Sequence, residues 1–385
     1  MILGIDASNL RYGGGITHLT ELLSVADPEA HGFSRVIVWG GRATLDRLAD
    51  RPWLTRVAEP ALDGNIAART LWQSVELPRR LARERCDLLF APGGTAPALA
   101  RPRVVMCRNM LPFDPVERRR YRLTATRARL EVLRVAQARS FASADGVIFL
   151  THYAHDAVRA AMPSAPKRAA IISHGVNPRF FAEPKPQRAL ADCTQDNPFR
   201  WVYVSTVTRY KHQWAVAEAM RALRAEGLPV AIEFAGLGDD PQSVTALSSR
   251  LRDYDPASRW TSWKGHLPFA DIVDAYRRAD AAVYASSCEN MPNILLESMA
   301  SGLPVACSNR GPMPEIIGDA AAFFDPEDPH DIARAARVML RSPDARAKMA
   351  ADAVALARRY SWHRCADETF TFLRDVATST TRAPR

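Results

Sequence analysis

The sequence lacks any run of about 20 uninterrupted apolar residues, which is the length that a membrane-spanning helix requires. Its first residues, Met1–Asp6, carry no basic segment and reach a carboxylate too early for a secretory signal peptide. No two of the six cysteines form a C-x-x-C pair, so buried reduced thiols are expected rather than disulfides or zinc. We therefore expect a cytoplasmic protein without a membrane span.

Motifs for nucleic acid and for nicotinamide cofactors are also missing. The net charge of +9 suits anionic partners such as nucleic acid, anionic lipid or phosphorylated substrates. However, the chain has no zinc-finger spacing and no aromatic strand of the RNP type, so no nucleic-acid partner is expected. Without a G-x-G-x-x-G fingerprint, a nicotinamide cofactor is not favoured either.

Short apolar runs alternate with amphipathic helical stretches along the 385 residues, a pattern typical of α/β folds with parallel sheets. The polar segment 183–198 contains three prolines and no periodicity, which is typical of an interdomain linker. We expect an N-terminal Rossmann-like domain over 1–182, a second over 199–360, and a C-terminal helix with a tail over 361–385. Ligands of such domains bind beyond the carboxyl ends of the strands, so the natural site is the cleft between them.

The most informative segment is Ala281–Gly302, AAVYASSCENMPNILLESMASG. It predicts a strand, a loop carrying Glu289, and a helix that begins near Asn293, holds Glu297 and stops at Gly302. The first N–H groups of that helix, from Asn293, Ile294 and Leu295, would bind phosphate without a cation. Two carboxylates beside that site suit sugar and ribose hydroxyls. The alternative is that Glu289 and Glu297, each taken alone, are ordinary surface acids near the start of a helix.

The segment E-N-M-P-N-I-L-L-E-S-M-A-S-G-L-P-V resembles the E-x7-E segment of family-4 glycosyltransferases. Three further blocks are similar to the family pattern and extend the resemblance over most of the chain, most strongly over 200–325: I-I-S-H-G-V-N-P-R-F, F-A-G-L-G and G-P-M-P-E-I-I-G-D-A-A. The resemblance implies the GT-B fold, in which two Rossmann-like domains face each other across a cleft. It also implies metal-independent transfer with retention of anomeric configuration, and no cofactor.

Site residues follow from matching positions. By resemblance, Glu297 would hold the donor ribose, and Glu289 would contact hydroxyls of the transferred sugar. Lys211 matches the family lysine that grips the diphosphate, and a cation there would stabilise the leaving group. The usual arginine position is Thr206, so Arg209 is the candidate replacement.

In the first domain, the glycines Gly14 and Gly15 permit close approach of backbone to the donor diphosphate and the acceptor. Arg108 and Asn109 stand where many members have a His-Asp pair on the acceptor side. His18 and His174 are given no role, because a lone histidine is more often structural.

Two other features of the sequence each allow two interpretations. Asp253 and Asp255 have the D-x-D spacing of a metal site, but a surface turn is the expected structure, and no metal is expected. The stretch Val116–Phe141 holds eight arginines and is either a solvated helix or a peripheral contact with an anionic membrane at its inner face.

We expect a glycosyltransferase that moves a sugar from a nucleotide-diphosphate donor to a saccharide or lipid-linked saccharide. The favoured setting is bacterial surface polysaccharide, such as O-antigen, capsule or exopolysaccharide, with mannose from GDP-mannose as the candidate donor. The alternatives are a nucleotide-sugar epimerase of the same fold and a non-catalytic nucleotide-sugar-binding scaffold.

Overall fold

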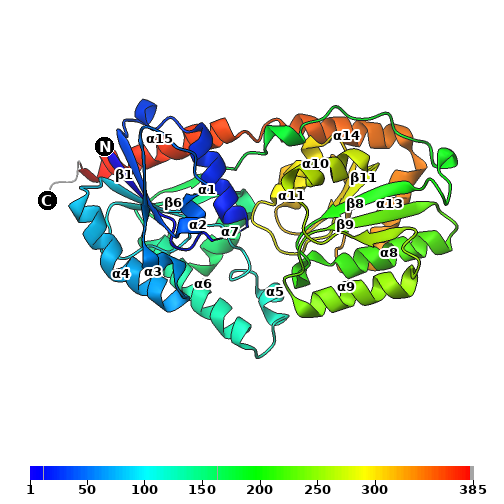
Figure 1. Ribbon diagram of the computed structural model, residues 1–385, viewed down its shortest axis with the longest axis horizontal. Coiled ribbons are helices and arrows are strands. Elements are labelled where there is room, and N and C mark those ends of the chain that lie inside the picture. The colour runs from blue at the N-terminus through cyan, green and yellow to red at the C-terminus, as the bar shows by residue number, and fades with distance from the viewer. Residues whose placement is uncertain (12, 163, 382–385) are drawn as a thin grey trace. The chain divides into compact units, whose positions relative to one another are not determined.

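The computed structural model describes residues 1–11, 13–162 and 164–381 (Figure 1). The chain forms two compact units. Unit 1 contains Met1–Gly175 together with the chain from Ser361 onward, and unit 2 contains Val176–Tyr360. Each unit is an α/β layer structure built on one parallel sheet, as the alternating pattern predicts.

Unit 1 holds a seven-stranded parallel sheet in the order β3-β2-β1-β4-β5-β6-β7. Its strands are β1 (Ile2–Asp6), β2 (Arg35–Gly40), β3 (Leu54–Ala58), β4 (Leu88–Ala91), β5 (Arg103–Met106), β6 (Gly146–Phe149) and β7 (Ala169–Ile171). Its helices are α1 (Gly14–Val25), α2 (Arg42–Leu45), α3 (Pro60–Asp63), α4 (Ile66–Arg83), α5 (Pro115–Arg119), α6 (Ala125–Ser143), α7 (His152–Ala161) and α15 (Trp362–Thr381).

Unit 2 holds a six-stranded parallel sheet in the order β10-β9-β8-β11-β12-β13. Its strands are β8 (Phe199–Val204), β9 (Val230–Ala235), β10 (Thr261–Trp263), β11 (Ala281–Tyr284), β12 (Val305–Ser308) and β13 (Ala321–Phe324). Its α-helices are α8 (Gln213–Ala225), α9 (Pro241–Tyr254), α10 (Phe269–Arg278), α11 (Asn293–Ala300), α12 (Met313–Ile317), α13 (Pro329–Arg341) and α14 (Pro343–Ala357). The short 3-10 helix η4 (Arg209–Lys211) follows β8.

Helices cover the sheets, so the central strands are continuous apolar runs. In unit 1, Trp72 and Leu77 of α4 pack with Ile37 and Trp39 of β2 in one buried cluster. All six cysteines are free thiols, and five of them are buried. The expectation of buried reduced thiols is therefore confirmed for all but Cys86, which is half-buried.

The expected long helix over Val116–Phe141 is wrong in one respect, because the structure divides it into α5 and α6. Thr124 accepts a hydrogen bond from the amide of Arg127 at 3.3 Å and so starts a new helix. Arg122 just before it takes a left-handed backbone conformation with a φ of 43°. Strands β3, β10 and β13 were not expected from the sequence.

The segment 183–198, expected as a linker between domains, lies inside unit 2. The fully buried Arg346 of α14 donates hydrogen bonds to the carbonyl of Arg188 and to the side chain of Gln187. Lys185 donates to the carbonyl of Ala279 at 3.1 Å. These bonds fix a proline-rich segment onto unit 2, so the division of the chain falls at Gly175 and Val176 instead of near residue 182.

The C-terminal helix α15 packs on α1 of unit 1. At its start, a Cβ on Gly175 would lie 2.2 Å from the amide nitrogen of Trp362, so only glycine allows this approach. The ring of Trp362 also stacks on His174, with 5.5 Å between centroids, and meets His18 edge-on. The final segment thus belongs to the same compact unit as the first strands.

Candidate functional site

The candidate site of unit 2 lies beyond two neighbouring strands. β8 pairs with β11 in parallel, so the loops that follow them emerge at the same edge of the sheet. The amide of Ser287 donates to the carbonyl of Tyr210 at 2.8 Å, and the hydroxyl of Ser287 meets Nε2 of His212 at 2.8 Å. These contacts join the loop after β8 to the loop after β11.

Lys211 and Glu289 form an ion pair between these two loops. Nζ of Lys211 also donates to the hydroxyl of Tyr284 at 2.7 Å, and that hydroxyl donates to Oε1 of Glu289 at 2.6 Å. Ser286 donates to the same carboxylate oxygen at 2.5 Å. Two residues predicted as catalytic are thus brought into direct contact, held by two that were not predicted.

The ion pair is largely shielded from solvent, with 9% of the Lys211 side chain and 13% of the Glu289 side chain exposed. Tyr203 of β8 donates from its hydroxyl to the carbonyl of Lys211 at 2.5 Å. Burial and the charge of Glu289 raise the pKa of the Tyr284 hydroxyl well above its usual value. Tyr284 therefore keeps its proton and serves as the donor to Glu289.

Helix α11 begins directly after this loop, as expected. Asn293, Ile294 and Leu295 are its first residues, and its first N–H groups have no acceptor within the helix. Glu297 lies on the same helix and is half-buried. Burial raises the pKa of its carboxyl group to about 7. Helix α11 therefore carries both free amide groups at its start and a carboxyl group whose pKa is raised.

Arg209 lies on η4, two residues before Lys211. Its Nε lies 3.1 Å from Oδ1 of Asp240, the residue that caps α9. The arginine is thereby oriented by an acid of its own unit. Whether it contacts a diphosphate stays a prediction.

In unit 1, the structure brings together Gly14 and Arg108. Gly14 opens α1, and Gly13 before it has a φ of 68°, a left-handed conformation that favours glycine. A guanidinium nitrogen of Arg108 donates to the carbonyl of Gly14. Burial lowers the pKa of Arg108 to about 10. Arg108 therefore links the start of α1, where Gly15 follows Gly14, to the carboxyl end of β5.

Asn109, beside Arg108, uses its side-chain oxygen locally. This oxygen accepts a hydrogen bond from the amide of Leu111 at 3.1 Å. The contact shapes the loop after β5, and a role toward an acceptor stays a prediction.

The Asp253 and Asp255 pair does not form the expected surface turn. Asp253 lies within α9, and the buried Asp255 follows the last residue of that helix. The carboxylate of Asp255 accepts hydrogen bonds from the amides of Arg259, Trp260 and Thr261 at 2.7–2.9 Å. It is therefore a structural group that closes the turn into β10.

Tyr284 and Ser286 are the functional candidates that sequence reasoning missed. Tyr284 is fully buried in a strand whose other residues are apolar, so it looked like a core residue. Their positions five and three residues before Glu289 were the available signal. Side chains near the carboxyl end of a parallel strand are well placed to meet the loop that follows.

Among the residues described, no helix has both the length and the apolar character needed to cross a membrane.

Comparisons with known proteins agree with this arrangement. Residues 12–180 match the family model described as Glycosyltransferase Family 4, and residues 194–355 match the model described as Glycosyl transferases group 1. The chain is 34% identical over 110 residues to O-antigen chain mannosyltransferase B of Escherichia coli, which covers 29% of each chain. It is 30% identical over 155 residues to the D-inositol 3-phosphate glycosyltransferase of Segniliparus rotundus, over 40% of this chain and 34% of that protein. The matched parts thus span about a third of these relatives.

One relative aligns along nearly the whole chain. Alpha-maltose-1-phosphate synthase of Mycolicibacterium smegmatis is 24% identical over 397 residues, 95% of this chain and 96% of that protein. Among solved structures, sucrose-phosphate synthase from Thermosynechococcus elongatus matches with a TM-score of 0.75 and 15% identity, over 98% of this chain and all of that one. Anabaena HepE in complex with UDP-glucose matches with a TM-score of 0.66 and 17% identity, over 99% of each chain.

The two family models and the shared architecture agree on one assignment. The chain belongs to the group 1 glycosyltransferases of the family-4 type, which have the GT-B fold.

Proposed function

We propose that the protein transfers a sugar from a nucleotide-diphosphate donor to a hydroxyl of a saccharide or lipid-linked saccharide, with retention of configuration. The observation that carries this proposal is the shielded Lys211–Glu289 pair beside the N-terminus of α11. A cation and free amides together suit the diphosphate, which gains charge as it leaves. A carboxylate beside them suits the hydroxyls of a sugar.

Each charged group has a distinct part in this proposal. Lys211 stabilises the departing phosphate, and Glu289 binds hydroxyls of the transferred sugar and favours positive charge at its anomeric carbon. Glu297 accepts hydrogen bonds from the ribose in its ionised form. Arg209 supplies a second cation near the diphosphate. The acceptor hydroxyl bonds to the anomeric carbon as the bond from that carbon to the donor phosphate breaks, and this phosphate takes the hydroxyl proton, so the transfer needs no protein nucleophile or base. Lys211 and the first amides of α11 stabilise the diphosphate, so no metal is proposed.

The substrate class is proposed from the relatives. One relative is named as an O-antigen chain mannosyltransferase, and one structural neighbour was solved with UDP-glucose. We propose a hexosyl donor, with GDP-mannose first and UDP-glucose second, and an acceptor that belongs to a bacterial surface polysaccharide. An acceptor on a lipid carrier would place the enzyme at the inner face of the membrane. In unit 1, Gly14, Gly15, Arg108 and Asn109 are proposed to serve the donor diphosphate and the acceptor.

A transfer assay tests the proposal. The protein is incubated with GDP-mannose or UDP-glucose and with saccharide and lipid-linked acceptors, and release of the nucleoside diphosphate is measured. The anomeric configuration of the product is then read by NMR. Transfer with retention supports the proposal. Epimerised donor without any acceptor would instead show an epimerase, and tight donor binding without turnover on any acceptor would show a scaffold.

A further inference from the structure

Helix α4 of unit 1 carries an apolar stripe on its outer side as well as on its inner side. The inner side places Trp72, Leu77 and Leu81 in the core. On the outer side, Leu71 and Val75 are 65% and 40% exposed. A surface helix normally turns a single apolar stripe toward the core. The outer stripe recurs every three or four residues and so lies on one face: Ala67, Leu71, Val75, Pro78 and Ala82.

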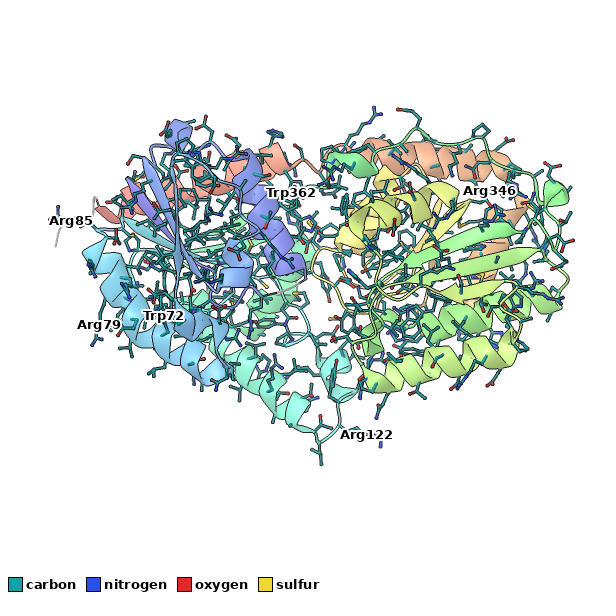
Figure 2. All side chains as sticks on the ribbon, viewed as in Figure 1. Trp72, Arg79, Arg85, Arg122, Arg346 and Trp362 are labelled. Atoms are coloured by element: carbon teal, nitrogen blue, oxygen red, sulfur yellow. The ribbon has the colours of Figure 1, made fainter. Side chains whose placement is uncertain are left out.

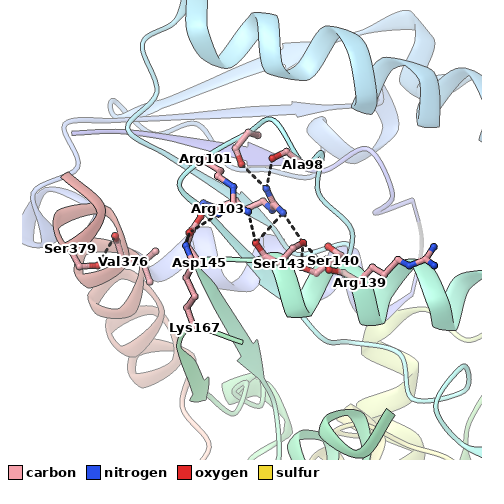
Figure 3. Close-up of polar contacts among 11 residues, drawn as sticks. Ala98, Arg101, Arg103, Arg139, Ser140, Ser143, Asp145, Lys167, Val376 and Ser379 are labelled. Carbon is pink, nitrogen blue, oxygen red and sulfur yellow. Dashed lines mark hydrogen bonds and ion pairs between the residues drawn. The ribbon is translucent and has the colours of Figure 1, made fainter. Parts of the chain in front are cut away.

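Leu99 is another exposed apolar residue near this stripe, and the buried Arg103 fixes the backbone on each side of it. Leu99 lies in the loop before β5 and is 84% exposed. Arg103, which is only 1% exposed, donates to the carbonyl of Ala98 at 2.8 Å (Figure 3). It also donates to the carbonyl of Ala100 at 3.3 Å, on the other side of Leu99. The same guanidinium is fixed by Ser143 of α6. The outward position of Leu99 is therefore part of the folded structure.

A cavity of about 190 Å³ lies between α4 and this loop. Apolar side chains from both elements, including Pro78, Ala82 and Leu99, line the cavity. Arg85 and Arg101 also line it, and both are exposed. Figure 2 shows Arg79 and Arg85 projecting from the outer side of this unit, whereas Trp72 lies inward. The exposed lining of the cavity is more polar than apolar, so its arginines suit a lipid phosphate, while Leu99 and the outer stripe of α4 supply the apolar contact.

The charge of the surrounding segment is strongly positive. Residues 66–143 contain sixteen arginines and six acidic residues, a net charge of +10, whereas the whole chain carries +9. Part of this charge is neutralised on α5 and α6, because Glu131 forms ion pairs with Arg118, Arg127 and Arg134. Arg79 and Arg101 beside the α4 stripe are also ion-paired, with Glu76 and Asp145. The recurrent apolar stripe of α4, rather than charge alone, makes this helix the stronger candidate for a docking surface than the arginine-rich stretch 116–141.

We propose that the outer stripe of α4, Leu99 and the adjoining cavity, together called the α4 surface, dock the protein on an anionic phospholipid bilayer. Exposed leucines enter the boundary between headgroups and acyl chains, and nearby arginines bind lipid phosphates. A second copy of the chain is a poorer occupant, because a symmetric contact would set two surfaces of the same strong positive charge against each other. This proposal is independent of the proposed enzymatic function.

Vesicle co-sedimentation tests the proposal with the full chain and no nucleotide sugar present. Vesicles of phosphatidylcholine alone are compared with vesicles that also contain phosphatidylglycerol. The wild type is expected to bind only the anionic vesicles, and less at high salt. The variant Leu71→Glu/Val75→Glu and the single variant Leu99→Glu are each expected to lower the partition coefficient by about tenfold or more, because each loses apolar burial and adds a repelled charge.

Matched controls keep the result specific. Leu237→Glu and Val338→Glu alter exposed apolar residues of unit 2 and should leave vesicle binding unchanged. Circular dichroism and thermal unfolding confirm that each variant folds. The proposal is overturned if the wild type does not bind anionic vesicles, or if Val132→Glu on α6 abolishes binding while the α4 variants retain it. A dimer in solution that the α4 variants dissociate, without vesicle binding, would show that a second copy covers this surface instead.

Discussion

The hydroxyl of Tyr284 lies between the two charged groups of the candidate site, accepting from Lys211 at 2.7 Å and donating to Glu289 at 2.6 Å. Tyr284 is fully buried, so this hydroxyl has no solvent to replace either partner. Removing this hydroxyl takes away a hydrogen-bond acceptor of Lys211 and a hydrogen-bond donor to Glu289, two side chains that are nearly buried. The tyrosine therefore positions both groups.

Tyr284→Phe should lower kcat by about tenfold to a hundredfold, since loss of one buried partner costs about 1–3 kcal/mol. The free energy of unfolding should fall by a similar amount. Steady-state kinetics on the transfer reaction and urea unfolding measure the two effects. Tyr203→Phe is the matched control: its hydroxyl bonds to backbone groups, including the carbonyl of Lys211, and the variant should affect kcat less. Equal kcat for Tyr284→Phe and the wild type would contradict the positioning role.

Lys211→Ala and Glu289→Ala should each abolish most turnover while the protein stays folded, because each removes a charge that the departing diphosphate or the sugar requires. Initial rates with saturating donor measure this effect. Near-wild-type turnover in both variants would refute the site.

The ion pair itself can be tested by a double-mutant cycle. Lys211→Met and Glu289→Gln should each destabilise the fold, because each leaves a shielded partner unpaired. The double variant should be more stable than the sum of the single effects predicts. Purely additive free energies of unfolding would show that the two side chains do not interact.

Glu297 should make the stability of the fold depend on pH. Its folded pKa of about 7 lies above the ordinary value of 4.5, so the fold disfavours the ionised form. Its contribution to stability is fully present below pH 4.5 and is lost as the pH rises through 7. Glu297→Gln should therefore raise stability relative to the wild type at pH 8, by about 3 kcal/mol, and should have a much smaller effect at pH 5.

Thermal unfolding of both proteins across this pH range measures the difference, and Glu315→Gln on α12 controls for an exposed acid. The same carboxyl group should affect donor binding with the opposite sign, because the ionised form can accept hydrogen bonds from both hydroxyls of a ribose diol, whereas protonation turns one of its oxygens into a donor. Donor affinity should fall as the pH is lowered through 7 in the wild type only. A pH-independent difference in stability between wild type and Glu297→Gln would contradict the raised pKa.

Gly236→Ala should destabilise unit 2 by more than about 3 kcal/mol, since both strain and a clash oppose it. Gly236 has a φ of 139°, and a Cβ there would lie 2.0 Å from the carbonyl oxygen of Ser205. Gly227→Ala is the control, because Gly227 has a φ of 86° but no atom within 4 Å of an added Cβ. Chemical denaturation compares them, and equal losses would show that the close approach of the β9 loop to the β8 loop is unimportant.

Much of the fold could be predicted because buried parallel strands are continuous apolar runs. Helix α11 begins at Asn293 and ends just before Gly302, as predicted. Strand β3 was missed because Leu54–Ala58 lies at the edge of its sheet and is mostly half-buried or exposed, so it lacks the apolar signal. The helix break near Arg122 depends on a capping hydroxyl and a left-handed residue, which periodicity does not register.

The parts of the candidate site that could be predicted are the charged residues in the loops after strands. Glu289 and Glu297 were named from their positions around a predicted helix start, and Lys211 was named from the family resemblance. The structure brings Lys211 and Glu289 into contact. Tyr284 was missed because a buried strand tyrosine is ordinarily a core residue. The raised pKa of Glu297 depends on burial by residues distant in sequence, so no local pattern reveals it.

We propose that unit 2 binds a nucleotide-diphosphate sugar through Lys211, Glu289, Glu297 and the start of α11. A thermal-shift measurement with GDP-mannose, UDP-glucose, UDP-N-acetylglucosamine and the free diphosphates tests it most directly. A donor present at 100 times its dissociation constant should add about 2.7 kcal/mol of stability. One donor is expected to stabilise the wild type but not Glu297→Ala or Lys211→Ala. Equal stabilisation of all three proteins would contradict it.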